Sequence, residues 1–131
     1  MMTMVRFRTN EGIFLAPVEG VLEVRKASEV MPLPGKKEGV AGLIERNGQA
    51  LTVLSTFGAG GAHVVLLSAG AHKFGLIASE VSGVVNVSEL DIEPAPLGQT
   101  RPLVAGVVNA RTGMELMLSV DALWGELQKL G

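Results

Sequence analysis

Apolar and polar residues alternate in short runs along this chain, and turn-forming residues separate the runs. Residues 5–8 alternate with a period of two, which indicates a half-buried strand. The turn residues Asn10-Glu11-Gly12 follow, and residues 13–16 form a second apolar run. Two such runs on either side of a turn predict a β-hairpin.

Three more hairpins are predicted further along the chain. Residues 40–44 and 50–54 flank Asn47-Gly48, a pair typical of a type I′ turn because both positions need positive φ. Residues 64–67 pair with 74–78 across Gly70-Ala71, and residues 104–109 pair with 115–118 across Thr112-Gly113. The units 40–54 and 104–118 both begin with an apolar run rich in small residues. This similarity hints at two alike halves.

Other segments predict single strands, helices and loops. Residues 81–87 suggest a strand with a bulge at Gly83. Pro17 suits the first position of a short helix, since its φ is fixed near the helical value. Ser119 is a plausible N-cap for a closing helix. The longer patterns are a near-helical spacing at Val18, Val21, Leu22 and Val24, another at Leu123, Leu127 and Leu130, and proline-rich loops at 31–35 and 91–101.

The predicted elements amount to about nine or ten short strands and one or two short helices. Closely spaced strands with turn signals favour a barrel or sandwich in a single all-β domain over residues 1–131. No helix of 10–15 residues alternates with the strands, which argues against a doubly wound α/β fold.

Composition narrows the possible partners and the compartment. Apolar residues make up 47% of the chain, charged residues 18%, and the net charge is −2. No basic cluster exceeds Lys36-Lys37, so we expect no binding to nucleic acid or to an anionic membrane. No signal peptide or membrane-spanning run is visible. We expect a cytoplasmic protein.

Candidate chemistry is sparse, and we expect neither an enzyme nor a cofactor or metal site. The chain has no cysteine, and His63 and His72 have no nearby carboxylate in the sequence. No serine lies in a nucleophile elbow. The glycine-rich residues 58–61 lack the lysine and the following helix of a phosphate loop. Glu89, Asp91 and Glu93 lack the glycine and terminal glutamate of a calcium loop.

Six segments in order resemble the CheW-like domain family, the coupling modules of bacterial chemosensory arrays. No single segment is specific, but together they span nearly the whole chain. They are Ile13-Phe14-Leu15-Ala16-Pro17 with the following Val21-Leu22-Glu23-Val24, the loop Met31-Pro32-Leu33-Pro34-Gly35, the run Val40-Ala41-Gly42-Leu43-Ile44 with Gly48, the strand from Phe74 to Val81, Asp91-Ile92-Glu93-Pro94-Ala95-Pro96, and the segments 104–107 and 117–123.

The resemblance implies two small SH3-like five-stranded β-barrels that share an apolar core. It also implies a non-catalytic adaptor with two partners. One partner is the helical cytoplasmic tip of a chemoreceptor, which lies in a groove between the barrels. The other is the CheW-like regulatory domain of a chemotaxis histidine kinase. The pathway is either chemotaxis or an alternative one such as pilus motility.

Site residues carried over by position are Val21 and Val24 as groove lining, with Gly42, Asn47 and Gly48 on the hairpin beside the groove. Apolar anchors and small residues suit the recognition of a helix in a groove. The expected result of Val21→Glu is weaker receptor binding with the fold intact.

The hairpin departs from the family's Asn-Leu-Arg-Gly pattern, because this chain has Glu45-Arg46-Asn47-Gly48. Asn47 therefore stands at the usual arginine position. Glu23 matches the acidic residue that commonly pairs with that arginine, and we expect the pair to be lost unless Arg46 substitutes. Arg46 is one position earlier and should point to the opposite face of the strand.

An alternative interpretation is a small β-barrel sensor that binds a small molecule in a cleft. Such a cleft would be lined by several convergent polar or aromatic groups. The chain offers few aromatic residues for it, with four Phe, one Trp and no Tyr.

Overall fold

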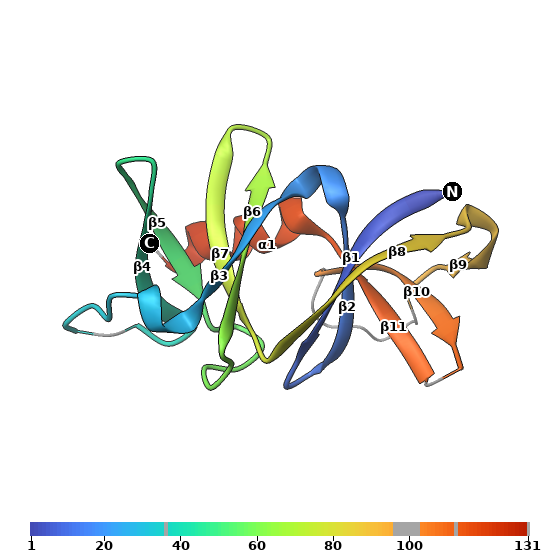
Figure 1. Cartoon of the computed structure of the whole chain (residues 1–131), viewed down its shortest axis with the longest axis horizontal. Coiled ribbons are helices and arrows are strands. Elements are labelled where there is room, and N and C mark those ends of the chain that lie inside the picture. Colours follow the sequence, from blue (N-terminus) through green and yellow to red (C-terminus); the bar gives the residue numbers. More distant parts are fainter. Residues whose placement is uncertain (36, 96–102, 112, 131) are drawn as a thin grey trace.

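The strands form two sheets that lie side by side, with one helix crossing the five-stranded sheet (Figure 1). This computed structural model describes residues 1–35, 37–95, 103–111 and 113–130. The six-stranded sheet has the order β8-β1-β2-β11-β10-β9. Its strands are β8 (Glu80–Val87), β1 (Met2–Thr9), β2 (Gly12–Pro17), β11 (Gly113–Leu118), β10 (Val104–Ala110) and β9 (Ile92–Glu93).

The five-stranded sheet has the order β3-β6-β7-β5-β4. Short 3₁₀ turns, η1 (Val18–Gly20), η2 (Ala27–Glu29) and η3 (Glu89–Asp91), connect strands, and the helix α1 (Val120–Leu130) closes the chain. The strands of this sheet are β3 (Val21–Lys26), β6 (His63–Ala69), β7 (His72–Ala78), β5 (Gln49–Leu54) and β4 (Val40–Arg46).

The two sheets repeat one strand plan, which confirms that the chain has two alike halves. Each sheet has an edge strand, a hairpin and then a second hairpin. The two hairpins are joined by one parallel pairing, β2 with β11 in one sheet and β5 with β7 in the other. In both halves the second hairpin has a bulge, near Gly42 and near Gly106.

Each sheet also curls until its two edges are linked by a short crossing. In the five-stranded sheet the chain leaves β3, turns through η2, and Met31 then bridges to Leu43 of β4. In the six-stranded sheet the chain leaves β8, turns through η3, and β9 pairs with β10. Each half is therefore a small barrel. One barrel has a sixth strand because its crossing segment pairs over the two residues of β9, whereas the crossing segment of the other barrel pairs only through Met31.

Three apolar clusters hold the molecule together. One lies inside each barrel, around Leu66 in the five-stranded barrel and around Leu15 in the six-stranded barrel. The third and largest lies between the barrels and takes residues from both sheets and from α1, including Phe7, Phe74 and Leu123. The expected shared core is thus confirmed, and each barrel has in addition an apolar core of its own.

Most local predictions are confirmed. All four hairpins form, although Thr112 of the last turn lies outside the described residues. Gly83 lies beside a break in the register between β1 and β8. Ser119 caps α1, because its Oγ accepts a hydrogen bond from the Ala122 N–H at 3.3 Å. Residues 96–101 of the second predicted loop lie outside the described residues.

The short helix predicted after Pro17 is confirmed as η1, but the helical interpretation of the residues that follow it is wrong. Only η1 is helical there, and residues from Val21 onward form the strand β3. The register of β3 against β6 breaks between Val21 and Glu23. This bulge inserts Leu22 as an extra residue, so the apolar positions no longer alternate and their spacing imitates a helix.

Candidate functional site

Val21 and Val24 lie on one face of the edge strand β3. Val21 is opposite Leu67 and Val24 is opposite Val65, and both of these partners belong to the core between the barrels. Directly opposite residues of an antiparallel pair share a face. Val21 packs against this core, whereas Val24 is 43% exposed. The bulge therefore presents an apolar side chain to solvent beside the seam of the two barrels.

This difference between the two valines matters for the expected effect of Val21→Glu. A glutamate at this position would lose the apolar packing of the valine against the shared core. It would also leave an unpaired charge there. Val21→Glu would therefore disturb the fold as well as the surface, contrary to our expectation. A substitution at Val24 would instead change the exposed surface without disturbing the core.

Asn47 and Gly48 form the exposed turn between β4 and β5. Their φ angles are 51° and 80°, both positive as a type I′ turn requires. The Gly48 N–H donates to the Glu45 carboxylate across the turn.

Gly42 is placed differently, because it is buried within β4. A Cβ there would collide with the carbonyl oxygen of Met31, where the crossing segment passes over the strand. Gly42 thus permits closure of the barrel and does not lie on the exposed surface.

The acid–arginine pair is present, because Arg46 substitutes for the arginine missing at position 47, although strand alternation argued against this substitution. Arg46 Nε donates to Glu23 Oε2 at 2.8 Å. Arg46 is the last residue of β4 and shares the inward face with Ile44, while Asn47 already belongs to the turn. Strand alternation ends at Arg46, so Arg46 itself, and not the next residue, faces Glu23.

The pair belongs to a chain of four charges at the edge where the five-stranded barrel closes. Arg25 lies 3.6 Å from Glu23 through Nη1 and 2.6 Å from Glu29 through Nη2. The hydrogen bond from Arg25, and then the one from the Lys26 backbone N–H, lower the pKa of the Glu29 carboxyl below its ordinary value. The hydrogen bond to Glu29 in turn raises the pKa of Arg25. The charges join β3, η2 and β4.

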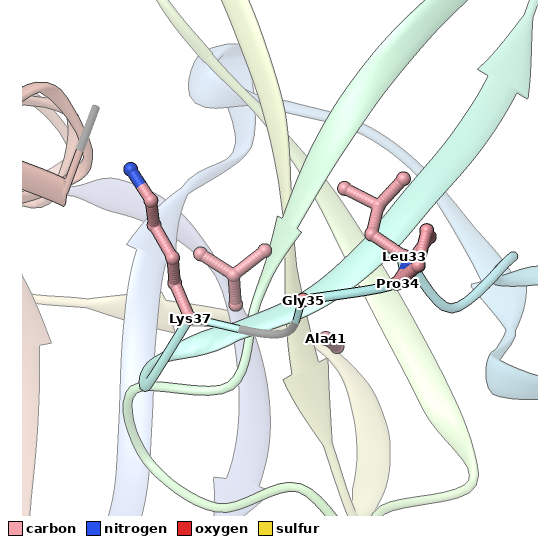
Figure 2. A pocket seen from close by; sticks show the side chains of 6 residues that line it. Leu33, Pro34, Gly35, Lys37 and Ala41 are labelled. Atoms are coloured by element: carbon pink, nitrogen blue, oxygen red, sulfur yellow. The ribbon is translucent and has the colours of Figure 1, made fainter.

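A second surface lies over the proline-rich loop. A hollow of about 220 Å³ opens between this loop and the start of β4. Figure 2 shows the side chains of Leu33 and Lys37 at opposite ends of the loop segment that borders it. Met31, at the start of the same loop, is 67% exposed. The loop therefore carries apolar side chains that the barrel leaves uncovered.

Sequence reasoning missed a charged contact between residues far apart in the chain. It is in the other barrel, where Arg6 donates through Nε and Nη2 to Glu115 Oε1 at 3.1 and 2.8 Å. Glu115 is buried, and Arg6 supplies the charged partner that a buried carboxylate needs. An isolated glutamate in a strand gives no signal of this pairing.

Two further searches bear on chemistry and location. Within the described residues, no group of three or more His, Cys, Asp or Glu is arranged to hold a metal ion. No helix in the same part of the chain is long and apolar enough to cross a membrane.

Comparisons with known proteins agree with the architecture. The family model of the CheW-like domain matches residues 3–128. The chemotaxis protein CheW of Treponema pallidum (strain Nichols) is 25% identical over 145 residues, covering 97% of this chain and 85% of that protein. The crystal structure of the scaffolding protein TtCheW from Thermoanaerobacter tengcongensis superposes with a TM-score of 0.79 at 22% identity, covering 91% of this chain and 84% of that one. Because the family model matches nearly the full length of this chain, the chain belongs to the CheW-like domain family.

Proposed function

We propose that this chain is a non-catalytic adaptor that couples chemoreceptors to a chemotaxis-type histidine kinase. The observation that carries the proposal is the family match over residues 3–128, which spans both barrels. Within this proposal the protein works in the cytoplasm at membrane receptor arrays, in chemotaxis or in an alternative pathway such as pilus motility.

The receptor contact is assigned to the exposed face of β3. An amphipathic receptor helix buries apolar side chains at helical spacing when it lies in an apolar groove. Val24 supplies an exposed anchor there, and Val21 supplies the floor where the groove meets the shared core. Asn47 and Gly48 lie at the border of this surface. The Glu23–Arg46 pair holds their turn there, because it links the end of β4 to β3.

The kinase regulatory domain needs a second surface, since an adaptor holds two partners at once. The proline-rich loop offers one, because Met31 and Leu33 are exposed apolar residues of this loop and Leu33 lines the hollow. Exposed apolar residues that cluster beside a hollow favour a protein contact. We assign the kinase contact to this loop.

Val24→Glu tests the receptor assignment. The variant places a charge where an apolar anchor is buried on binding, so affinity for a soluble receptor cytoplasmic fragment should fall about tenfold or more. Calorimetric titration of the full chain measures the affinity, and circular dichroism checks that the strand content is unchanged.

Met114→Glu is the matched control. Met114 is also an exposed apolar residue in a strand, but it lies in the six-stranded sheet near the β10–β11 turn. Receptor affinity should be unaffected by this change. Equal losses for both variants, or no loss for Val24→Glu, would refute the assignment to β3.

A further inference from the structure

A separate cleft lies where β5 and β7 part. These parallel strands pair only through Val53 with Gly75 and Leu54 with Leu76. Before these pairs, residues 49–52 of one strand and 71–73 beside the other line a cleft of about 450 Å³. This volume falls within the range of small-molecule sites in proteins.

The helix α1 forms the third wall of the cleft. It follows β11 of the six-stranded sheet but packs across the other barrel, against β6. The Trp124 ring stacks on His72, with centroids 4.4 Å apart and planes at 10°, and lies 5.8 Å from Phe74. Leu127 lies one turn further along the helix and also lines the cleft. The wall is therefore an aromatic and aliphatic surface held in a fixed orientation.

The polar groups around this wall are donors or neutral amides. Lys73 contributes a positive charge, and Thr52, Gln49 and Gln128 contribute hydroxyl and amide groups. No aspartate or glutamate is among the residues that line the cleft in the described part of the chain. Within the part of the chain that the structure describes, this cleft of a net-negative protein has a cation and no opposing carboxylate among its lining residues, which favours an anionic ligand.

We propose that this cleft binds a small organic carboxylate with an aromatic or aliphatic body. The body lies against Trp124 and Leu127, because flat apolar groups gain most from an aromatic wall. The carboxylate accepts from Lys73, with the side-chain amide of Gln128 as a further donor. Such a site has the convergent aromatic and polar groups that a sensor interpretation requires, and it does not depend on the adaptor role.

Phenylacetate and its neutral analogue phenylacetamide test the proposal with the full chain. Trp124 is the single tryptophan of the sequence and lines this cleft, so its fluorescence responds to binding there. Phenylacetate should bind saturably with a Kd on the order of 1 mM, and more tightly than phenylacetamide. Amide signals of residues 49–52, 71–73 and 124–128 should shift in nuclear magnetic resonance spectra.

Two variants isolate the charge. Lys73→Gln should weaken phenylacetate binding about two- to fivefold, the range of a solvent-exposed ion pair, and leave phenylacetamide unaffected. Gln128→Glu places a carboxylate in the cleft and should weaken phenylacetate binding in the same direction. Lys129→Gln is the matched control, since Lys129 is exposed, pairs with Glu126 at 3.7 Å and does not line the cleft.

Saturable binding that Lys73→Gln weakens and Lys129→Gln leaves unchanged would support the carboxylate site. The proposal is overturned if phenylacetate does not saturate, if Lys73→Gln and Lys129→Gln have equal effects, or if the shifted signals lie outside the cleft. None of these outcomes bears on receptor binding by β3, so the two proposals fail separately.

Discussion

Two glycines set how closely the chain can cross over itself in the two barrels. A Cβ on Gly42 would collide with the carbonyl oxygen of Met31, and one on Gly106 would lie 2.9 Å from that of Glu93. Both glycines lie at a bulge in the hairpin that receives the crossing segment. At both positions the absence of a side chain lets the edge segments of a barrel meet.

Gly42→Ala should destabilise the protein by about 2 kcal/mol or more, because the crossing segment must move or the backbone must distort. Chemical denaturation followed by circular dichroism measures the change. Gly60→Ala is the control, since nothing lies within 4 Å of a Cβ at Gly60. Its effect should stay within about 0.5 kcal/mol. A Gly42→Ala protein as stable as Gly60→Ala would contradict the role assigned to Gly42.

At the scale of elements, charges fasten the edge strands of the five-stranded barrel. Among the described residues, backbone hydrogen bonds join β4 to the crossing segment only at Met31 and Leu43. The Glu23–Arg46 pair adds a side-chain link between β3 and the end of β4, and the Arg25–Glu29 pair fixes η2 at the start of the crossing. The face of β3 that we propose as the receptor contact is therefore held by contacts that depend on ionisation.

The lowered pKa of Glu29 makes the stabilisation by the Arg25–Glu29 pair sensitive to pH. The contribution of the Glu29 carboxylate is present above its ordinary pKa of 4.5 and is lost as pH falls through its lower folded-state pKa. The wild type should exceed Glu29→Gln in denaturation midpoint at neutral pH, and this gap should close in acid. Urea titrations of both proteins across this pH range measure the gap.

The Arg25→Gln background serves as the control for this pH effect. Without the guanidinium that contributes most to the shift, Glu29→Gln should change the midpoint less, and with a weaker dependence on pH. A gap that widens on acidification would contradict the assignment.

At the scale of the whole molecule, the two barrels share too much surface to behave as separate domains. The core between them draws on β1 and β2 of one barrel, on β6 and β7 of the other, and on α1. Neither sheet can lose its partner without exposing Phe7, Phe74 and their neighbours.

Unfolding should therefore be a single cooperative transition. Trp124 fluorescence, which reports on the five-stranded barrel and α1, and far-ultraviolet circular dichroism, which reports on both sheets, should give one denaturation midpoint. Two separated midpoints would show that the barrels unfold independently and would contradict the shared core.

How far the sequence predicted this molecule depends on the range of the interactions involved. The hairpin at Asn47-Gly48 and the cap at Ser119 are specified by adjacent residues, and both were predicted. The strand β3 was not predicted, because the bulge at Leu22 removed its alternation. The Glu23–Arg46 pair and the burial of Gly42 arise from barrel closure, which joins residues distant in the chain and leaves no local pattern.

The strand order has a consequence for the protein as it leaves the ribosome. Residues 21–78 contain every strand of the five-stranded sheet, so all strands of this sheet are made before β8. The hairpin of β1 and β2 emerges first, yet its sheet neighbours β8 and β11 come after residue 79. Until those strands are made, the shared-core residues of the five-stranded sheet are the apolar cover available to Phe7 and Phe14. We therefore expect the β1–β2 hairpin to pack on this sheet first, and the shared core to be completed only when β8, β11 and α1 have been made.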